Sequence, residues 1–429
     1  MPWPRGAAAY GRGGGPTAAL ASLTSVSMTP GADEPRTVLL TLSGEDRPGV
    51  TSALFDALAE VGAEVLDLEQ VVVRGRLTLA ALLAADGPSG PLVTVAEEVG
   101  ARLGMDVRFS SGRGDNAHRR TGRVAVVVIG APLRAGAVAQ VARSIAAHGA
   151  NIDRIRRLAR YPVTTIELDV SGAEVTALRG ELALVAAAAG IDVAVAPAGL
   201  ARRGRRLVVM DVDSTLIQDE VIELLAAHAG REAEVAAVTE RAMRGELDFA
   251  ESLTARVAAL SGLPASVFEQ VRESVRLTPG ARTLVRTLQR LGFAVALVSG
   301  GFLEVVGPIA ADLGIGLVAA NSLEVRDGVL TGRTAGEIVD RAGKAAALRR
   351  FAAAEGLPLS RTVAVGDGAN DIDMLQAAGL GVAFNAKPLV REQADASVTV
   401  PYLDAVLFLL GITREEIEEA DAADGTAAL

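Results

Sequence analysis

Hydrophobic and polar positions change their period along the chain, and these changes divide it into parts. Residues 36–111 and 122–198 each contain short apolar runs typical of strands, several of them alternating, interspersed with two helical patterns. Each part shows the order strand, helix, strand, strand, helix, strand. The pattern therefore predicts two successive ferredoxin-like domains of the βαββαβ type.

From residue 206 to 411 the apolar runs become continuous and alternate with helical patterns. The runs are Leu207–Met210, Ala294–Val298, Thr362–Val365 and Val382–Phe384. Such strands indicate a parallel, Rossmann-like sheet covered by helices on both faces, an α/β fold. A helical segment at about 217–278 interrupts the sheet after its first strand. We expect it to form a cap over the strand ends.

Three further segments show polar or small-residue patterns. Residues 1–35 are rich in Gly, Pro, Ala, Ser and Thr and lack a continuous apolar stretch, so we expect a disordered tail and no signal peptide. Met28 is an alternative start. The basic run Arg202–Arg206 is typical of a solvated linker. The acidic residues at 412–429 indicate a frayed helix and tail.

Composition narrows the chemistry. The chain of 429 residues has a formal net charge of −10, which argues against nucleic acid as a partner. It has no cysteine, which excludes disulfides and thiolate metal sites and fits a reducing cytoplasm, where we expect the protein. None of its 3 histidines neighbours a motif, and no apolar run is long enough to span a bilayer. Catalysis must rest on carboxylates, lysine, arginine and hydroxyl groups.

Polar motifs follow three of the predicted strands, and a lysine lies between the second and third. They are Asp211-Val-Asp213-Ser-Thr215, Ser299-Gly300-Gly301, Lys344 and Gly366-Asp367-Gly-Ala-Asn370-Asp371. Taken singly, each is more often a turn or a surface charge. Because ligands of parallel sheets bind beyond the carboxyl ends of the strands, the four in order indicate a phosphoryl-transfer site.

These motifs resemble the four signature motifs of the haloacid dehalogenase (HAD) superfamily of phosphohydrolases. The resemblance implies Mg²⁺ bound by Asp211, the backbone carbonyl of Asp213 and Asp367. It implies that Asp211 attacks phosphorus to form an aspartyl-phosphate and that Asp213 acts as the general acid and then the base. The phosphate would be bound by the Ser299 hydroxyl, the Gly300 and Gly301 N–H groups and Lys344, with Asn370 and Asp371 orienting the lysine and the metal shell.

The cap sequence narrows the substrate. Ile217–Glu220, Ala242–Phe249 and Glu251–Val257, with Leu277–Gly280 and Ala320–Glu324 outside the cap, resemble the phosphoserine phosphatase family. That resemblance implies the last step of serine biosynthesis. Glu220 would bind the substrate ammonium and Arg256 its carboxylate, and Met243 and Phe249 would form an apolar wall. Taken singly, Glu220 is an ordinary helix-start carboxylate and Arg256 a surface charge.

The two amino-terminal domains resemble ACT domains, which often bind amino acids. In the first, Asp46-Arg-Pro-Gly49 matches the family's loop before the first helix, so Asp46 and Gly49 are candidates for binding a regulatory amino acid such as serine. The second has Ala131–Gly136 there instead, which favours structural pairing. Regulation and dimerisation remain equally open for the first, and we expect a homodimer.

Two other functions remain open. One is a HAD phosphatase or phosphotransferase that acts on another small phosphorylated metabolite. The other is an amino-acid sensor with a degenerate catalytic part, but such a protein would lack the nucleophile or the lysine, and Asp211 and Lys344 are both present.

Overall fold

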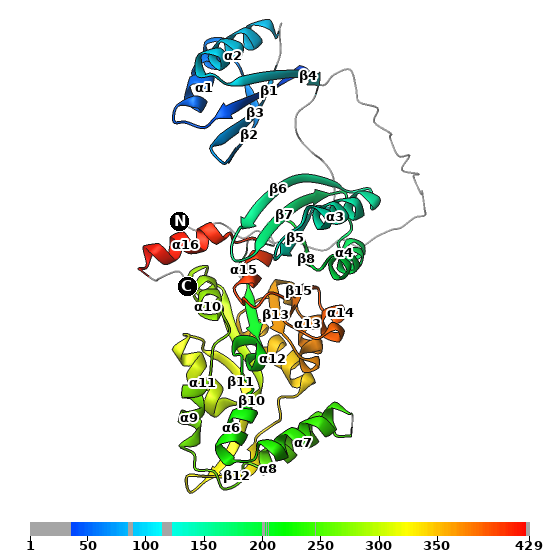
Figure 1. Ribbon diagram of the computed structural model, residues 1–429, viewed down its shortest axis with the longest axis vertical. Coiled ribbons are helices and arrows are strands. Elements are labelled where there is room, and N and C mark those ends of the chain that lie inside the picture. The colour runs from blue at the N-terminus through cyan, green and yellow to red at the C-terminus, as the bar shows by residue number, and fades with distance from the viewer. Residues whose placement is uncertain are drawn as a thin grey trace, which may run out of the picture. The chain divides into compact units, whose positions relative to one another are not determined.

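The computed structural model describes residues 36–84, 89–113, 122–199, 202, 204, 206–244 and 246–425, without the side chain of Met243. The chain forms two compact units, Met1–Arg119 and Arg120–Leu429 (Figure 1). The tail predicted at residues 1–35 lies outside the described residues. The fold class predicted from the sequence is confirmed, with two ferredoxin-like domains ahead of an α/β core.

The first unit is a single ferredoxin-like domain. Its elements are β1 (Arg36–Glu45), α1 (Val50–Glu60), β2 (Val65–Val73), β3 (Arg76–Ala84), α2 (Gly90–Leu103) and β4 (Asp106–Arg113). The antiparallel sheet has the order β2-β3-β1-β4. Leu40 and Leu42 of β1 pack with Leu54 of α1 in the core. The edge strand β2 leaves most of its apolar side chains exposed, among them Val71 and Val73.

The second ferredoxin-like domain has the same order of elements. They are β5 (Val124–Gly130), α3 (Ala135–Ala147), β6 (Asn151–Ala159), β7 (Thr164–Ser171), α4 (Val175–Ala189) and β8 (Asp192–Pro197). Unlike β1, strand β5 is buried on both faces. Val126 and Val128 face the domain's own helices, whereas Val127 and Ile129 pack into the core of the α/β part. The continuous apolar run of β5 reflects this second contact.

The α/β part extends the sheet of the second ferredoxin-like domain. Its strands are β9 (Leu207–Met210), β10 (Ala294–Phe302), β11 (Leu317–Arg326), β12 (Val329–Ala335), β13 (Thr362–Gly366), β14 (Leu380–Phe384) and β15 (Ala396–Val398). The joint sheet has 11 strands in the order β12-β11-β10-β9-β13-β14-β15-β8-β5-β7-β6. Strands β9, β10, β13 and β14 are parallel, and β15 meets β8 through the antiparallel pair Ala396 and Ala194.

Helices cover both faces of the parallel strands, as the continuous apolar runs predict. Val208 of β9 belongs to the core on one face, and its neighbour Val209 belongs to the core on the other. The helices are α10 (Ala281–Arg290), α11 (Leu303–Asp312), α12 (Arg341–Ala354), α13 (Ile372–Ala377), α14 (Pro388–Gln393) and α15 (Ala405–Leu409). The cap contains α6 (Val221–Ala229), α7 (Glu232–Met243), α8 (Phe249–Ala258) and α9 (Val267–Ser274). Helix α9 and the β11–β12 hairpin were not predicted.

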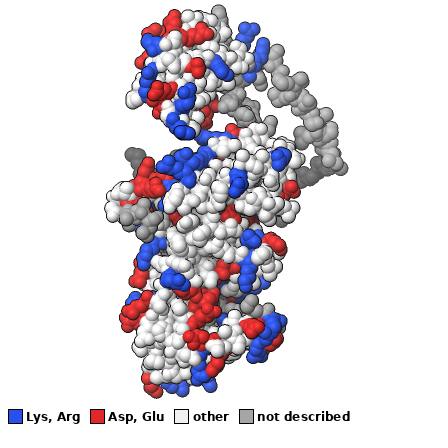
Figure 2. Space-filling view, in the orientation of Figure 1, with Lys and Arg blue, Asp and Glu red and all other residues white. Residues whose placement is uncertain are grey.

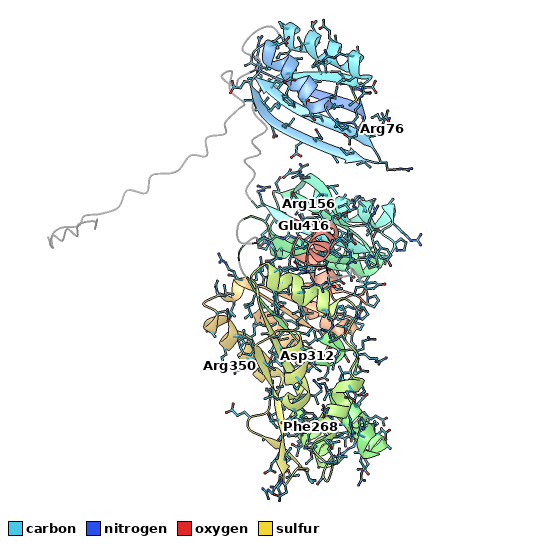
Figure 3. The ribbon with its side chains drawn as sticks, turned by 90° about the vertical axis from the view of Figure 1, so that its left-hand side faces the viewer. Arg76, Arg156, Phe268, Asp312, Arg350 and Glu416 are labelled. Atoms are coloured by element: carbon cyan, nitrogen blue, oxygen red, sulfur yellow. The ribbon has the colours of Figure 1, made fainter. Side chains whose placement is uncertain are left out.

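The carboxyl-terminal region differs from the predicted frayed tail. Helix α16 (Arg414–Ala423) begins with a capping box formed by Thr413 and Glu416. Its Asp421 is 2% exposed and accepts hydrogen bonds from Arg286 and Arg290 of α10. The helix also contacts β6, whose Arg156 is labelled with Glu416 in Figure 3. The acidic sequence is ordered because its charges meet arginines distant in the chain.

Charged side chains of both signs are interspersed over the face shown in Figure 2. Among the described residues, no helix is both long and apolar enough to cross a membrane.

Candidate active site

The turn after β9 fixes two carboxylates. Asp211 is 3% exposed, and its Oδ1 accepts a hydrogen bond from the Val212 N–H at 2.7 Å. Ser214 has a φ of 56°, a left-handed conformation that reverses the chain tightly. The Asp213 Oδ1 accepts a hydrogen bond from the Val221 N–H at 2.8 Å. Backbone donors therefore hold both carboxylates at the carboxyl end of the sheet.

A buried lysine joins two carboxylates at this edge. The Nζ of Lys344 lies 2.7 Å from Asp211 Oδ2 and 2.7 Å from Asp371 Oδ1. Burial lowers the pKa of Lys344, but the charges of Asp211 and Asp371 outweigh it, and the net result is a pKa above the ordinary value. The lysine is therefore charged throughout the physiological range.

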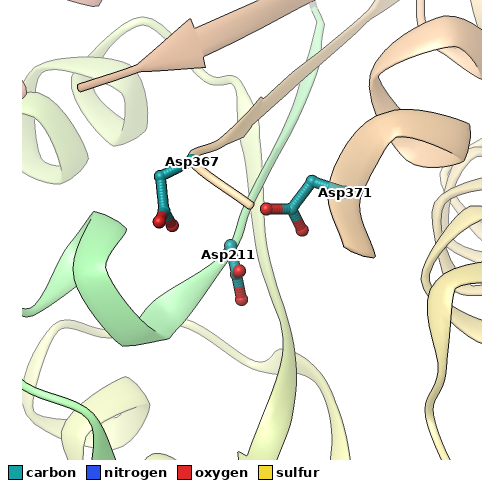
Figure 4. Close-up of side chains that lie close together, drawn as sticks. All are labelled: Asp211, Asp367 and Asp371. Atoms are coloured by element: carbon teal, nitrogen blue, oxygen red, sulfur yellow. The ribbon is translucent and has the colours of Figure 1, made fainter. Parts of the chain in front are cut away.

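Carboxylate oxygens of Asp211, Asp367 and Asp371 lie within 4.8 Å of one another (Figure 4). Burial and the charge of Asp371 raise the pKa of Asp367 to about 6, and the same two causes raise that of Asp211 well above its ordinary value. These shifts mark an excess of negative charge that a bound cation would relieve. The donors are hard oxygens, which suit Mg²⁺.

Both oxygens of Asp211 have donors, the Val212 N–H and Lys344, and the same is true of Asp371. Oδ1 of Asp371 accepts from Lys344, and Oδ2 accepts from the Gly368 N–H at 3.0 Å. Asp367 instead accepts at Oδ1 from the Thr215 hydroxyl at 2.9 Å. The bond from Lys344 is consistent with Asp371 as a residue that holds the lysine.

The carboxyl end of β10, at residues 299–301, contacts Asp213. The Ser299 hydroxyl donates to Asp213 Oδ2 at 3.0 Å and accepts from the Gly301 N–H at 2.7 Å. A Cβ on Gly301 would lie 2.8 Å from Asp213 Oδ2, and one on Gly300 would lie 3.2 Å from Phe249 Cζ. Gly300 and Gly301 are needed here because a side chain at either position would keep the backbone away from the carboxylate and the cap.

A cavity of about 200 Å³ opens between this edge of the sheet and the cap. The candidates that line it are Asp211, Asp213, Glu220, Phe249, Arg256, Gly300, Gly301, Asp367 and Asn370. Ser299, Lys344 and Asp371 are buried against these residues. The side chain of Met243 is outside what the structure describes. Two apolar lining residues, Ile222 and Leu253, were missed, although Leu253 shares a helix face with Phe249 and Arg256.

Glu220 and Arg256 bring one charge of each sign to the cavity. Burial and the charge of Asp213 raise the pKa of Glu220 to about 7, while Ser214 donates to its Oε1 at 2.8 Å. Burial lowers the pKa of Arg256, an effect opposed by Glu220 and Asp213. No carboxylate among the described residues forms an ion pair with Arg256. A ligand with an ammonium and a carboxylate would complement both groups.

Two residues that hold the site were not singled out from the sequence. The Thr278 hydroxyl donates to the Thr215 carbonyl at 2.7 Å. Asn321 donates to the Gly300 carbonyl at 2.8 Å and accepts from the Val339 N–H at 2.7 Å, so it joins the carboxyl end of β10 to the segment before α12. Asn321 lies within β11, and its near-complete burial could not be inferred from the sequence.

The candidate regulatory residues Asp46 and Gly49 lie in the first unit. Both are exposed, and Gly49 precedes α1 with a φ of 94°. The Asp46 N–H donates to the Gly75 carbonyl at 2.8 Å. The loop thus presents the start of α1 to solvent.

Comparison with known families agrees with this geometry. Residues 208–376 match the model of haloacid dehalogenase-like hydrolases, and residues 36–110 and 123–196 each match an ACT domain.

The full chain also resembles individual proteins over most of its length. It is 61% identical to a phosphoserine phosphatase of Streptomyces coelicolor, over 90% of this chain and 94% of that protein. It is 56% identical to a phosphoserine phosphatase of Mycobacterium tuberculosis, over 90% and 96%. A solved structure of a probable phosphoserine phosphatase from Vibrio cholerae is similar with a TM-score of 0.54 and 34% identity, covering 70% of this chain and 88% of that one. The chain therefore belongs to the phosphoserine phosphatase family of haloacid dehalogenase-like hydrolases.

Proposed function

We propose that the protein hydrolyses O-phosphoserine to serine and phosphate through an aspartyl-phosphate, the last step of serine biosynthesis. The observation that carries this proposal is the pair Glu220 and Arg256, which line the same cavity of about 200 Å³ as Asp211. A zwitterionic amino acid carries an ammonium and a carboxylate, so its binding site needs one acidic and one basic side chain. The relatives at 61% and 56% identity are phosphoserine phosphatases.

We propose Mg²⁺ as the cofactor, held by Asp211, Asp367 and the backbone carbonyl of Asp213. The clustered carboxylates and their raised pKa values support a cation there. When bound, it would act as a Lewis acid on a phosphate oxygen and offset the charge of the ester. Thr215 would keep Asp367 oriented through its hydrogen bond.

In the first step the Asp211 carboxylate attacks phosphorus, and the bond from phosphorus to the serine oxygen breaks. Asp213 donates a proton to that oxygen. The Val221 N–H donates to Oδ1 of Asp213, and the Ser299 hydroxyl contacts Oδ2. Burial raises the pKa of Asp213, which favours the protonated form that this step needs. Lys344, the Ser299 hydroxyl and the Gly300 and Gly301 N–H groups would bind the other phosphoryl oxygens.

In the second step a water molecule attacks the phosphoryl group on Asp211. Asp213 Oδ2 takes the proton from the water, and the bond from Asp211 to phosphorus breaks. Phosphate leaves, and both carboxylates return to their starting states. Asp371 and Asn370 would keep Lys344 and the metal-binding groups in place throughout, and the lysine's bond to Asp371 supports this role.

The cap would hold the serine part of the substrate. Glu220 would bind the ammonium, whose charge would restore the ionised form of a carboxylate with a pKa of about 7. Arg256 would bind the carboxylate with its forked guanidinium. Phe249 and Met243 would form the apolar wall, with Ile222 and Leu253 beside Phe249.

A substrate panel tests the activity. Phosphate release from phosphoserine should exceed release from unrelated phosphomonoesters and should stop when EDTA removes the metal and return with Mg²⁺. Equal turnover across the panel would favour the alternative, a HAD phosphatase for another metabolite. Transfer of the phosphoryl group to added alcohols in preference to water would favour a phosphotransferase.

We propose a division into ACT domains at 36–111 and 122–198 and a phosphatase domain at 206–411 with its cap at about 217–278.

We also propose that serine regulates the enzyme by binding near Asp46 and Gly49. A cytoplasmic location stays a prediction. Gly49→Leu should abolish inhibition by serine, whereas Gly62→Leu, at another exposed glycine with positive φ at the other end of α1, should retain it. Equal inhibition of both variants would contradict the proposed effector site.

We further propose a homodimer formed through β2. Among the described strands β2 lies at the edge of its sheet, and its exposed valines and leucines favour contact with another apolar strand. Val71→Lys should yield a monomer in light scattering. A dimer of unchanged mass would contradict this interface.

A further inference from the structure

A second cavity lies at the opposite end of the catalytic strands. Its volume is about 630 Å³, against about 200 Å³ for the active-site cavity. Arg206, directly before β9, and Arg361, directly before β13, line it together with Arg202. The remaining wall is largely apolar and includes Pro197 of β8, Leu380 of β14 and Leu409 of α15. The second ACT domain and the phosphatase core thus both contribute to the cavity.

Arg202 and Arg206 are not the solvated linker charges that the basic run predicts, and Arg203 and Arg205 lie outside the described residues. Arg206 is 9% exposed, and the side chain of Arg202 is 12% exposed. Burial and, after it, the charges of Arg202 and Arg361 lower the pKa of Arg206. Gathering three guanidinium groups around one cavity costs free energy through mutual repulsion unless an anion joins them.

The protein's own acids compensate this charge in part. Arg202 pairs with the buried Glu167, which also binds Arg156, so one carboxylate is shared by two arginines. Arg202 also donates to the Leu409 carbonyl at 3.1 Å, but its buried Nε has no hydrogen-bond partner among the described residues. Arg361 is exposed and forms no ion pair within the part of the chain that the structure describes. Arg361 therefore brings to this cavity a positive charge with no ion-pair partner among the described residues, and Arg202 brings a buried Nε without a hydrogen-bond partner there.

We propose that this cavity binds a phosphate-bearing small molecule of nucleotide size, with its phosphates on Arg202, Arg206 and Arg361 and its apolar part against Pro197, Leu380 and Leu409. Guanidinium groups bind phosphate oxygens in pairs, and the volume lies in the range of pockets for small organic ligands. A ligand there would contact the second ACT domain and the phosphatase core at once. The inference goes beyond the proposed function and does not rest on it.

Titration calorimetry of the full chain without metal tests the site. The probes are ADP, inorganic pyrophosphate and adenosine, and the variants are Arg361→Ala and the control Arg349→Ala, an exposed arginine of α12 outside the cavity. We expect ADP to bind and adenosine not to bind. Arg361→Ala should weaken ADP binding by about 10-fold or more, because it removes a charged hydrogen-bonding partner. Arg349→Ala should bind as the wild type.

The variant Asp211→Asn distinguishes binding of ADP at this cavity from binding at the active site, whose cavity is too small for ADP. The variant should bind ADP as the wild type does. Pyrophosphate that binds as tightly as ADP, with the same loss in Arg361→Ala, would support the arginine site and identify the phosphates alone as the ligand. Absence of ADP and pyrophosphate binding at millimolar concentration would overturn the proposal. So would unchanged affinity in Arg361→Ala, or loss of ADP binding in Asp211→Asn.

Discussion

Two central strands of the sheet, β9 and β13, have opposite charges at their two ends. Strand β9 is preceded by Arg206 and followed by Asp211, and β13 is preceded by Arg361 and followed directly by Asp367. At the carboxyl end, burial and neighbouring acids raise the pKa of Asp211 and Asp367. At the amino end, burial and neighbouring arginines lower the pKa of Arg206.

The comparison shows how like charges gathered at a cavity indicate its ligand. A fold tolerates buried charges when each meets a partner of opposite sign. At the carboxyl end Lys344 supplies one cation for three clustered carboxylates, and at the amino end Glu167 supplies one anion shared by Arg202 and Arg156. The remaining charge favours a cation at one end and an anion at the other.

The largest expected effect is on phosphate release, from a substitution at the carboxyl end of strand β9. Asp211→Asn should lower phosphate release at least about 10³-fold, because an amide cannot attack phosphorus. Lys344 keeps its bond to Asp371, so the thermal midpoint should stay close to that of the wild type. Asp312→Asn, at an exposed carboxylate of α11, should leave turnover unchanged. Substantial activity in Asp211→Asn would remove this carboxylate as the nucleophile.

A smaller effect is expected from the cap. Glu220→Gln should lower kcat/KM for phosphoserine about 10- to 100-fold, because the ammonium loses a charged acceptor. A phosphomonoester without an ammonium should be hydrolysed as by the wild type. Glu223→Gln, on the exposed face of the same helix, is the matched control. Equal losses on both substrates would assign Glu220 to the phosphate end instead.

A further, smaller effect is expected in the pH dependence of kcat/KM for phosphoserine. The pKa of Glu220 is raised to about 7, so below that pH the free enzyme holds a neutral side chain that binds the ammonium weakly. We expect kcat/KM for phosphoserine to fall as the pH drops through about 7, and this limb to disappear in Glu220→Gln. An identical acid limb in that variant would place the titration in another group, such as the substrate phosphate.

Substitution at the junction between the phosphatase core and the second ACT domain should affect the free energy of unfolding and have the smallest effect on turnover. Glu167→Gln should lower the free energy of unfolding by about 2 to 3 kcal/mol, because Arg202 and Arg156 lose a carboxylate that is 2% exposed. Glu415→Gln, in the exposed pair with Arg157, should cost less than about 1 kcal/mol. Urea denaturation measures both. Equal losses would show that burial of the Glu167 pair is unimportant.

Much of the fold followed from local patterns, because the strands and helices of both ferredoxin-like domains and four strands of the α/β part were predicted by the period of their apolar residues. The continuous run of β5 held the signal that this strand is buried on both faces, but the run does not say which part of the chain covers it. Helix α16 was predicted only as a frayed helix and tail, because the arginines that bond its Asp421, Arg286 and Arg290, lie far away in the sequence. Such long-range pairs leave no local pattern.

The candidate site was predictable where backbone turns concentrate polar residues at strand ends, as at Asp211 and Asp367. The cavity indeed brings nine of the sequence candidates together, from Asp211 to Asn370. Ile222, Thr278 and Asn321 could not be distinguished from ordinary core or loop residues, because their roles depend on contacts between distant segments. The burial of Arg202 and Arg206 at the amino end of the strands could not be predicted for the same reason.

The most direct test of the central claim is to trap the phosphoryl group. The wild-type enzyme, mixed with phosphoserine and Mg²⁺ and quenched in acid within its first turnovers, should yield a peptide containing Asp211 that has gained one phosphoryl group by mass spectrometry. Asp213→Asn should slow both the formation and the removal of this group, because Asp213 is the acid of the first step and the base of the second. A phosphoryl group on another residue, or none on Asp211 while serine is released, would contradict the account.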